Sequence, residues 1–205
     1  MPYYKKNNIL FIHIPKTGGQ VIESQIVKFT EQTLLTDRPN SVLDPPYKKI
    51  SLQHQLYTTI YKNRDKLKVN FNGIKIFTVV RNPYFRLISD LFCYGLIKKD
   101  YTSDMVFKII KYNYLDRDDL DNHNIPQFKF VTDEKGNLID NIKIFKTEDL
   151  NDSNDELINF TGFNINIKQQ NVNKNYDRYL NKESIFLINS VYKKDFELFN
   201  YVMKL

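Results

Sequence analysis

The sequence predicts an α/β fold of three layers, in which helices flank a central parallel sheet as they do in P-loop proteins. Two segments carry this prediction: residues 8–20 and 74–89 each run from an apolar stretch through a polar turn into an amphipathic stretch. Buried parallel strands are typically continuous apolar runs. Open α/β sheets bind their ligands at the carboxyl ends of such strands. We therefore expect the functional residues to follow these two strands.

The first segment joins a predicted strand at 8–14 to a predicted helix at 18–30 through a turn with one lysine and two glycines. Glycines let the backbone approach an anion closely, and free N–H groups at a helix start point toward it. Lys16 adds a full positive charge, which indicates a phosphate site. Because Lys16 precedes Gly18 and Gly19, the turn is neither a Walker A loop nor a dinucleotide-binding G-x-G-x-x-G turn. On the turn alone, an ordinary strand-to-helix connection remains an alternative.

The second segment is a β-rich strand at 74–80 that leads into Arg81, Asn82 and Pro83. Pro83 is typical of the first turn of a helix, where a missing N–H costs little. Arg81 thus lies at a strand end, and Ser89 follows about two helical turns later. An arginine fork and a serine hydroxyl suit a second phosphate. Together the two segments predict a ligand with two separated phosphate-like groups.

With both turns, Phe11 to Gly19 and Val79 to Ser89, the chain resembles the sulfotransferases that use 3′-phosphoadenosine 5′-phosphosulfate (PAPS). Within that superfamily it is most similar to the carbohydrate branch that includes heparan sulfate 2-O-sulfotransferase, and to the soluble homologues of that branch. The resemblance covers nearly the whole chain, although only the two phosphate loops are diagnostic. It implies transfer of a sulfuryl group from PAPS to a hydroxyl acceptor, with a glycan favoured, and release of 3′,5′-ADP.

The resemblance also implies roles for particular residues. In the family the first loop binds the 5′-phosphosulfate, and the arginine and serine of the second motif bind the 3′-phosphate. The positions that match for cofactor binding are Pro15, Lys16, Thr17, Gly18, Gly19, Gln20, Arg81, Ser89, Asn173 and Lys174.

For catalysis, we expect in-line attack, with Lys16 stabilising the leaving phosphate and His54 acting as the general base. A histidine between the two motifs has this role in the carbohydrate branch, and a neutral imidazole suits the task near pH 7. A surface histidine on a helix is the alternative for His54. We expect His13 to be structural, and Asp119 and Glu148 are reserve candidates for the base. No grouping in the sequence suggests a metal, and we expect none.

Three departures from the family pattern, Gln20, Phe85 and Asn175, leave other functions open. One alternative is a catalytically weak or inactive sulfotransferase-like protein that binds an anion or a glycan. A nucleotide kinase of the P-loop type is a further alternative, which the order of Lys16 and the glycines disfavours.

The remaining periodicity predicts further helices at 51–65, 83–98, 103–115, 153–161 and 182–203, and a third strand at 141–146. Residues 31–50 contain three prolines and read as an irregular, substrate-facing loop. The acidic stretch 116–121 reads as a solvated turn.

Composition sets limits on these interpretations. A chain of 205 residues is expected to form a single domain, 1–205, and its net charge of +6 suits anionic ligands. The sequence contains no repeat of aromatic and basic residues of the kind that binds nucleic acid, so we expect no nucleic-acid partner. Cys93 is the only cysteine, so no intramolecular disulfide forms and a reducing compartment is favoured; we expect it to be buried. The first residues lack the apolar region of a signal peptide, and no run approaches the length of a membrane span, so we expect a cytoplasmic or soluble protein without an anchor in this chain.

Overall fold

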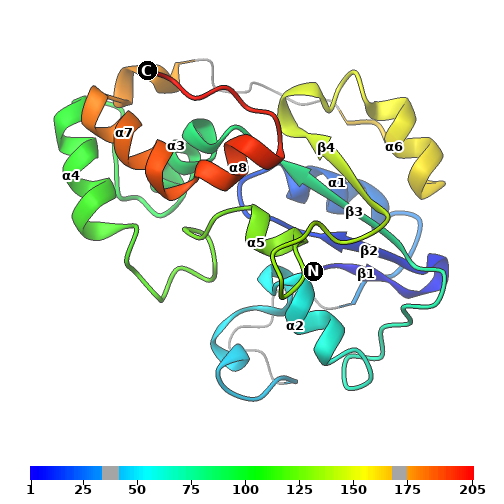
Figure 1. Cartoon of the computed structure of the whole chain (residues 1–205). Coiled ribbons are helices and arrows are strands. Elements are labelled where there is room, and N and C mark those ends of the chain that lie inside the picture. Colours follow the sequence, from blue (N-terminus) through cyan, green and yellow to red (C-terminus); the bar gives the residue numbers. More distant parts are fainter. Residues whose placement is uncertain (34–41, 168–174) are drawn as a thin grey trace.

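The computed structural model describes residues 1–33, 42–167 and 175–205, and its centre is a four-stranded sheet (Figure 1). In spatial order the strands are β1 (Tyr3–Tyr4), β2 (Ile9–Ile12), β3 (Lys75–Val80) and β4 (Ile142–Lys146). The last three pair in parallel, with Phe11 beside Phe77 and Val79 beside Phe145, whereas β1 pairs antiparallel with β2. The predicted α/β class with a parallel central sheet is confirmed. The antiparallel edge strand is an addition that the sequence did not predict.

Helices lie on both faces of this sheet and beside it. They are α1 (Gly19–Ile26), α2 (Tyr57–Lys62), α3 (Pro83–Cys93), α4 (Ser103–Asn113), α5 (Phe128–Val131), α6 (Asn154–Thr161), α7 (Lys182–Val191) and α8 (Lys193–Leu198). Side chains of α1 and α6 pack with one face, and side chains of α2 and α5 pack with the other. Helices α3, α4, α7 and α8 form a separate cluster beside the sheet, at the left in Figure 1.

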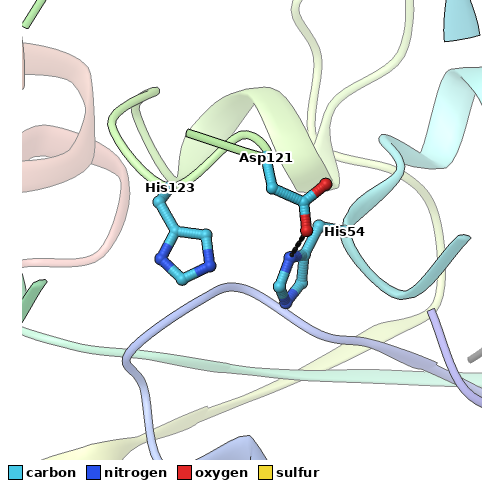
Figure 2. Close-up of side chains that lie close together, drawn as sticks. All are labelled: His54, Asp121 and His123. Atoms are coloured by element: carbon cyan, nitrogen blue, oxygen red, sulfur yellow. Dashed lines mark hydrogen bonds and ion pairs between the residues drawn. The ribbon is translucent and has the colours of Figure 1, made fainter. Parts of the chain in front are cut away.

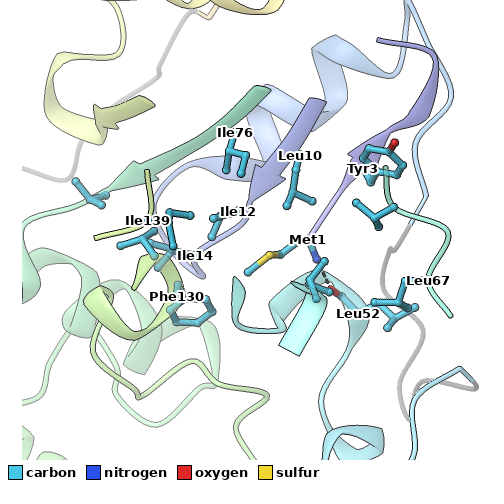
Figure 3. Packing of buried hydrophobic residues seen from close by; sticks show 14 of the residues in the cluster. Met1, Tyr3, Leu10, Ile12, Ile14, Leu52, Leu67, Ile76, Phe130 and Ile139 are labelled. Carbon is cyan, nitrogen blue, oxygen red and sulfur yellow. Dashed lines mark hydrogen bonds between the residues drawn. The ribbon is translucent and has the colours of Figure 1, made fainter. Parts of the chain in front are cut away.

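The strand residues alternate between the two faces, as their period of two requires. Leu10, Ile12 and Ile14 point to the face covered by α2 and α5, where Figure 3 shows them packed with Met1 and Phe130. The odd-numbered residues of β2 point to the opposite face with α1 and α6. Even-numbered and odd-numbered side chains of this strand therefore lie on opposite faces of the sheet. His13, which follows the strand, lies on the α1 side.

Two predicted helices are interrupted. The one expected at 51–65 is a short 3-10 turn, Leu52–His54, then extended backbone at Gln55, then α2. The amide of Gln55 donates to the carbonyls of Tyr47 and Ile50, at 2.9 and 2.8 Å, which holds it outside a helix. The one expected at 182–203 is divided at Tyr192 into α7 and α8.

Other differences concern ends and exposure. The helix expected at 83–98 ends at Cys93, since Gly95 has a left-handed φ of 65° that stops it. Cys93 is exposed, so the expectation that it is buried was wrong. The sequence did not predict α5, whose first residue, Phe128, donates its N–H to Asp195 of α8 at 2.8 Å.

Phe77 is the centre of the α1-side core, and we expect Phe77→Ala to destabilise the protein by about 3–5 kcal/mol. Its ring is fully buried and stacks on Phe11 at a centroid distance of 4.6 Å. Phe186→Ala is the matched control, because that ring is 77% exposed. Urea unfolding of both variants measures the difference, and equal losses would contradict the assigned packing.

Candidate active site

The loop between β2 and α1 is held by four consecutive carbonyl oxygens, each bound by a side chain. Thr17 Oγ1 donates to the carbonyl of Ile14 at 2.8 Å, and Thr147 Oγ1 donates to that of Thr17 at 2.6 Å. Arg86 Nε donates to the carbonyl of Pro15 at 3.0 Å. Arg81 Nη1 donates to that of Lys16 at 3.1 Å. All four of these carbonyl groups are thus bound by side chains of the protein.

The amide side of the same loop is free for a ligand. Lys16 and Gly18 have positive φ angles of 66° and 89°, which turn the chain into α1. Within the described residues, the N–H groups of residues 16–20 have no backbone acceptor. Consecutive free amides at a helix start form a concavity for an anion. The loop therefore has the form of a phosphate-binding site.

Gly19 has a specific steric reason to be glycine. A Cβ atom at this position would lie 2.8 Å from Nε2 of His13, which is closer than real Cβ contacts. His13 therefore packs against the loop at Gly19, and its purely structural role stays a prediction.

Arg81 follows β3 and is only 8% exposed. Gln127 fixes its backbone at both ends, accepting from the N–H at 2.9 Å and donating to the carbonyl at 2.8 Å. Burial lowers the pKa of its guanidinium, although nearby Tyr176 and Glu148 oppose the shift. Its Nε is buried and has no hydrogen-bond partner among the described residues. A buried unpaired donor beside the loop amides is what an anionic ligand would satisfy.

The other residues predicted to bind the cofactor differ in how they are placed in the structure. Lys16 is half-buried in the loop, and Gln20 is exposed in the first turn of α1. Ser89 is half-buried in α3, and in the described structure it makes no hydrogen bond to Lys16 or Arg81. Two further candidates, Asn173 and Lys174, lie outside the described residues.

His54 is half-buried beside the loop, with 12% of its side chain exposed. Its Nδ1 bonds Oδ2 of Asp121 at 2.8 Å, and Figure 2 shows the other ring nitrogen pointing away from that carboxylate. Ser51 donates to the same carboxylate from its N–H and its hydroxyl, at 2.7 and 2.8 Å. Asp121 therefore fixes both the orientation of the ring and the nitrogen that carries the hydrogen. The sequence placed Asp121 in a solvated turn, which is wrong, because this carboxylate is 7% exposed.

Burial lowers the pKa of His54 to about 4, and the neighbouring imidazoles of His13 and His123 contribute in the same direction. The hydrogen bond that His54 donates to Asp121 opposes this shift. The pKa of Asp121 is lowered: burial alone would raise it, but its hydrogen bonds with His54 and Ser51 prevail. At neutral pH His54 is therefore an uncharged imidazole with one free lone pair.

The three histidines of the chain form a row. The ring centroids of His13 and His54 are 5.3 Å apart, and those of His54 and His123 are 4.9 Å apart. His13 bonds Glu23 of α1, and His123 bonds Asp90 of α3 at 2.6 Å. Each imidazole thus has its own carboxylate.

One group of side chains is also spaced for a metal ion. Ligand atoms of His54, Asp121 and His123 lie within 4.8 Å of one another. The carboxylate of Asp121 already accepts three hydrogen bonds, so the group is satisfied without an ion. The sequence did not indicate this grouping, and the absence of a metal stays a prediction.

The reserve candidates for the base lie elsewhere. Asp119 forms a paired contact with Arg117 at the surface, with both oxygen distances at 2.7 Å. Glu148 accepts from the N–H of Asn82 and from the hydroxyl of Tyr201. Sequence reasoning missed Arg86, which lies in α3, and Thr147, which directly follows β4.

A loop with free amides, a buried arginine with an unpaired donor and a histidine with one unbonded ring nitrogen therefore lie near the carboxyl ends of β2 and β3. A model described as "Sulfotransferase family" matches residues 3–202. The chain therefore belongs to the sulfotransferase family, which confirms the resemblance seen in the sequence and makes sulfuryl transfer the general chemistry. Searches of curated proteins and of solved structures each returned no match.

Among the described residues, no helix combines the length and the apolar character needed to cross a membrane.

The lowered pKa of His54 gives a pH dependence of stability. The unfolded chain protonates this group near its ordinary value of 6.5, and the folded chain near 4. The free energy of unfolding should therefore fall as pH drops through this window. Between pH 6.5 and about 5 the loss from this group is about 1.5 kcal/mol.

His54→Gln should flatten that dependence over the same range, as measured by urea unfolding at several pH values. An unchanged slope in the variant would contradict the lowered pKa of His54.

Proposed function

We propose that the protein transfers a sulfuryl group from PAPS to the hydroxyl of an acceptor, with a carbohydrate as the favoured class. The observation that carries this proposal is the unpaired Nε of Arg81 beside a loop whose amides lack acceptors. PAPS has two phosphate-containing groups, and the loop amides and the guanidinium of Arg81 each offer donors to an anion. When bound, PAPS supplies the sulfuryl group and a phosphate as leaving group.

In this proposal the two ends of the donor are held differently. The loop amides and Lys16 bind the 5′-phosphosulfate, and Arg81 with Ser89 binds the 3′-phosphate. The cation of Lys16 stabilises charge that develops on the leaving phosphate oxygen. Because Gln127 and the carbonyl of Lys16 hold Arg81, little side-chain entropy remains to be lost on binding.

His54 is the proposed base. Its Nδ1 is engaged with Asp121, so Nε2 is left to accept the proton of the acceptor hydroxyl. The hydroxyl oxygen then forms its bond to sulfur as the bond between sulfur and the leaving phosphate oxygen breaks. Asp121 stabilises the imidazolium that results.

A protein that binds the anion without turnover, and a nucleotide kinase, remain the competing functions. Lys16 precedes the glycines, and this order disfavours the kinase because a Walker A lysine follows them. Ligand preference and turnover distinguish all three.

The first test is a thermal titration of the protein with 3′,5′-ADP, beside 5′-AMP and ATP with magnesium. At a hundredfold excess over the dissociation constant, 3′,5′-ADP should add about 2.7 kcal/mol of stability. Arg81→Ala should weaken binding by roughly 1.5–3 kcal/mol, since a charged hydrogen bond is lost.

Arg64→Ala is the control, because Arg64 packs on Tyr61 in α2, outside this site. An equal shift with ATP, or full affinity in Arg81→Ala, would contradict the proposed donor site.

A second test separates binding from chemistry. His54→Gln should lower kcat by about 100-fold or more, since general-base catalysis is removed, and leave the affinity for 3′,5′-ADP unchanged. Calorimetry gives the affinity, and release of 3′,5′-ADP from PAPS with a panel of glycan acceptors gives the rate. Equal rates in wild type and His54→Gln would exclude His54 as the base.

A further inference from the structure

The carboxylate of Glu23 has no role in the chemistry described above, although it lies one turn of α1 after Gly19 of the loop. Glu23 is 8% exposed, and its Oε1 bonds Nδ1 of His13. Gln53 donates from Nε2 to both oxygens of the same carboxylate, at 3.0 Å each. A buried carboxylate is costly unless hydrogen bonds satisfy it, and bonds to a charged acceptor are the strong ones. These three side chains therefore form a buried contact that includes α1.

Gln53 belongs to the 3-10 turn Leu52–His54 and directly precedes His54. Its side chain is buried with that of His13, and Nε2 of Gln53 lies 2.9 Å from Nδ1 of His13. Because a carboxylate only accepts hydrogen bonds, both of these nitrogens donate to Glu23. The contact therefore fixes the turn that carries His54 against α1.

His13 extends this contact to the loop itself. A Cβ atom at Gly19 would lie 2.8 Å from Nε2 of His13, so the ring packs directly against the start of α1. The ring centroid of His13 is also 5.3 Å from that of His54. The helix start that has free amides and the turn that carries His54 are thus connected through buried side chains.

Asp121 holds the same turn by different contacts. It accepts from the N–H and the hydroxyl of Ser51 and from Nδ1 of His54, and none of these three bonds involves α1. Asp121 therefore sets the orientation of the His54 ring. The contact between Gln53 and Glu23 sets the distance of the turn from α1.

We propose that Gln53, through its bonds to Glu23, is a positioning residue that holds His54 at a fixed distance from the loop between β2 and α1. This inference rests on the proposed role of His54 as the base and of the loop in binding PAPS. In-line attack requires the base, the acceptor hydroxyl and the sulfur to be aligned, and a misplacement of about 1 Å can lower the rate about 100-fold. Loss of the contact therefore slows transfer, while the loop amides and Arg81 still bind PAPS.

The first measurement requires no ligand. Amide hydrogen exchange of the whole protein, followed by NMR, reports on the N–H of His54, which bonds the carbonyl of Ser51 at 3.1 Å. Gln53→Met keeps the length of the side chain but removes its donor, so this N–H should exchange about tenfold faster or more, as expected for a lost hydrogen bond to a charged group. An unchanged exchange rate in Gln53→Met overturns the proposal.

Ser184→Ala is the matched control. Ser184 is fully buried in α7, in the helix cluster beside the sheet, and its hydroxyl donates to Oδ1 of Asn181 at 2.8 Å. The variant therefore also loses a buried hydrogen bond, but it should leave the exchange of the His54 N–H at the wild-type rate. A faster exchange of equal size in Ser184→Ala would show general loosening of the protein and overturn the proposal.

The second measurement compares rate with affinity at a temperature where circular dichroism shows every variant to be folded. Gln53→Met should lower kcat for release of 3′,5′-ADP from PAPS by about 100-fold, with the affinity for 3′,5′-ADP in calorimetry unchanged. Glu23→Gln weakens the same contact, so adding it to Gln53→Met should lower kcat little further. Multiplied effects in the double variant, or a loss of affinity as large as the loss of rate, overturn the proposal.

The failure of the proposed function is a separate result. If wild type neither binds 3′,5′-ADP nor releases it from PAPS, the proposed function is wrong, and the exchange measurement alone decides whether Gln53 holds the turn. If wild type is active and Gln53→Met keeps its rate, only the role of Gln53 is wrong.

Discussion

The site depends on the anchoring of four consecutive carbonyl oxygens in the loop between β2 and α1. Three of them are bound by side chains of other segments, which are Arg81 after β3, Arg86 in α3 and Thr147 after β4. The fourth is bound by Thr17 of the loop itself. Because the carbonyls are bound on the protein side, the amides are left on the ligand side. Contacts between distant segments therefore set the direction of the amides, and this direction decides whether an anion can bind.

The same anchors connect the loop to the rest of the site. Arg86 also donates to the carbonyls of His123 and Ile125, so one buried guanidinium joins the anion loop to the segment of the histidine row. Gln127, which holds Arg81, in turn receives support from Asp195 of α8 through its backbone N–H at 2.8 Å. Burial raises the pKa of Asp195. Helix α8, distant in sequence, thus contributes to the position of Arg81.

Buried polar groups at this site are paired almost completely, and the exception is informative. Asp121, Asp90 and Asp195 each accept two or more hydrogen bonds. Leaving a buried donor unpaired costs about 1–3 kcal/mol, so the free Nε of Arg81 raises the energy of the protein without ligand. Such a donor favours a ligand that can accept a hydrogen bond from it.

The sequence by itself determined the fold class and the two strand ends, since apolar runs, glycines and Pro83 are local signals that need no partner. It also determined the family, because the two phosphate turns occur in order. It could not give Asp121 or His123 as neighbours of His54, since these residues meet only through the folding of loops far apart in the chain. Nor could it show that Arg81 and Arg86 differ, one with an unpaired buried donor and the other anchoring three carbonyls. Hydrogen bonds between distant segments, which leave no periodic trace in a sequence, decided these roles.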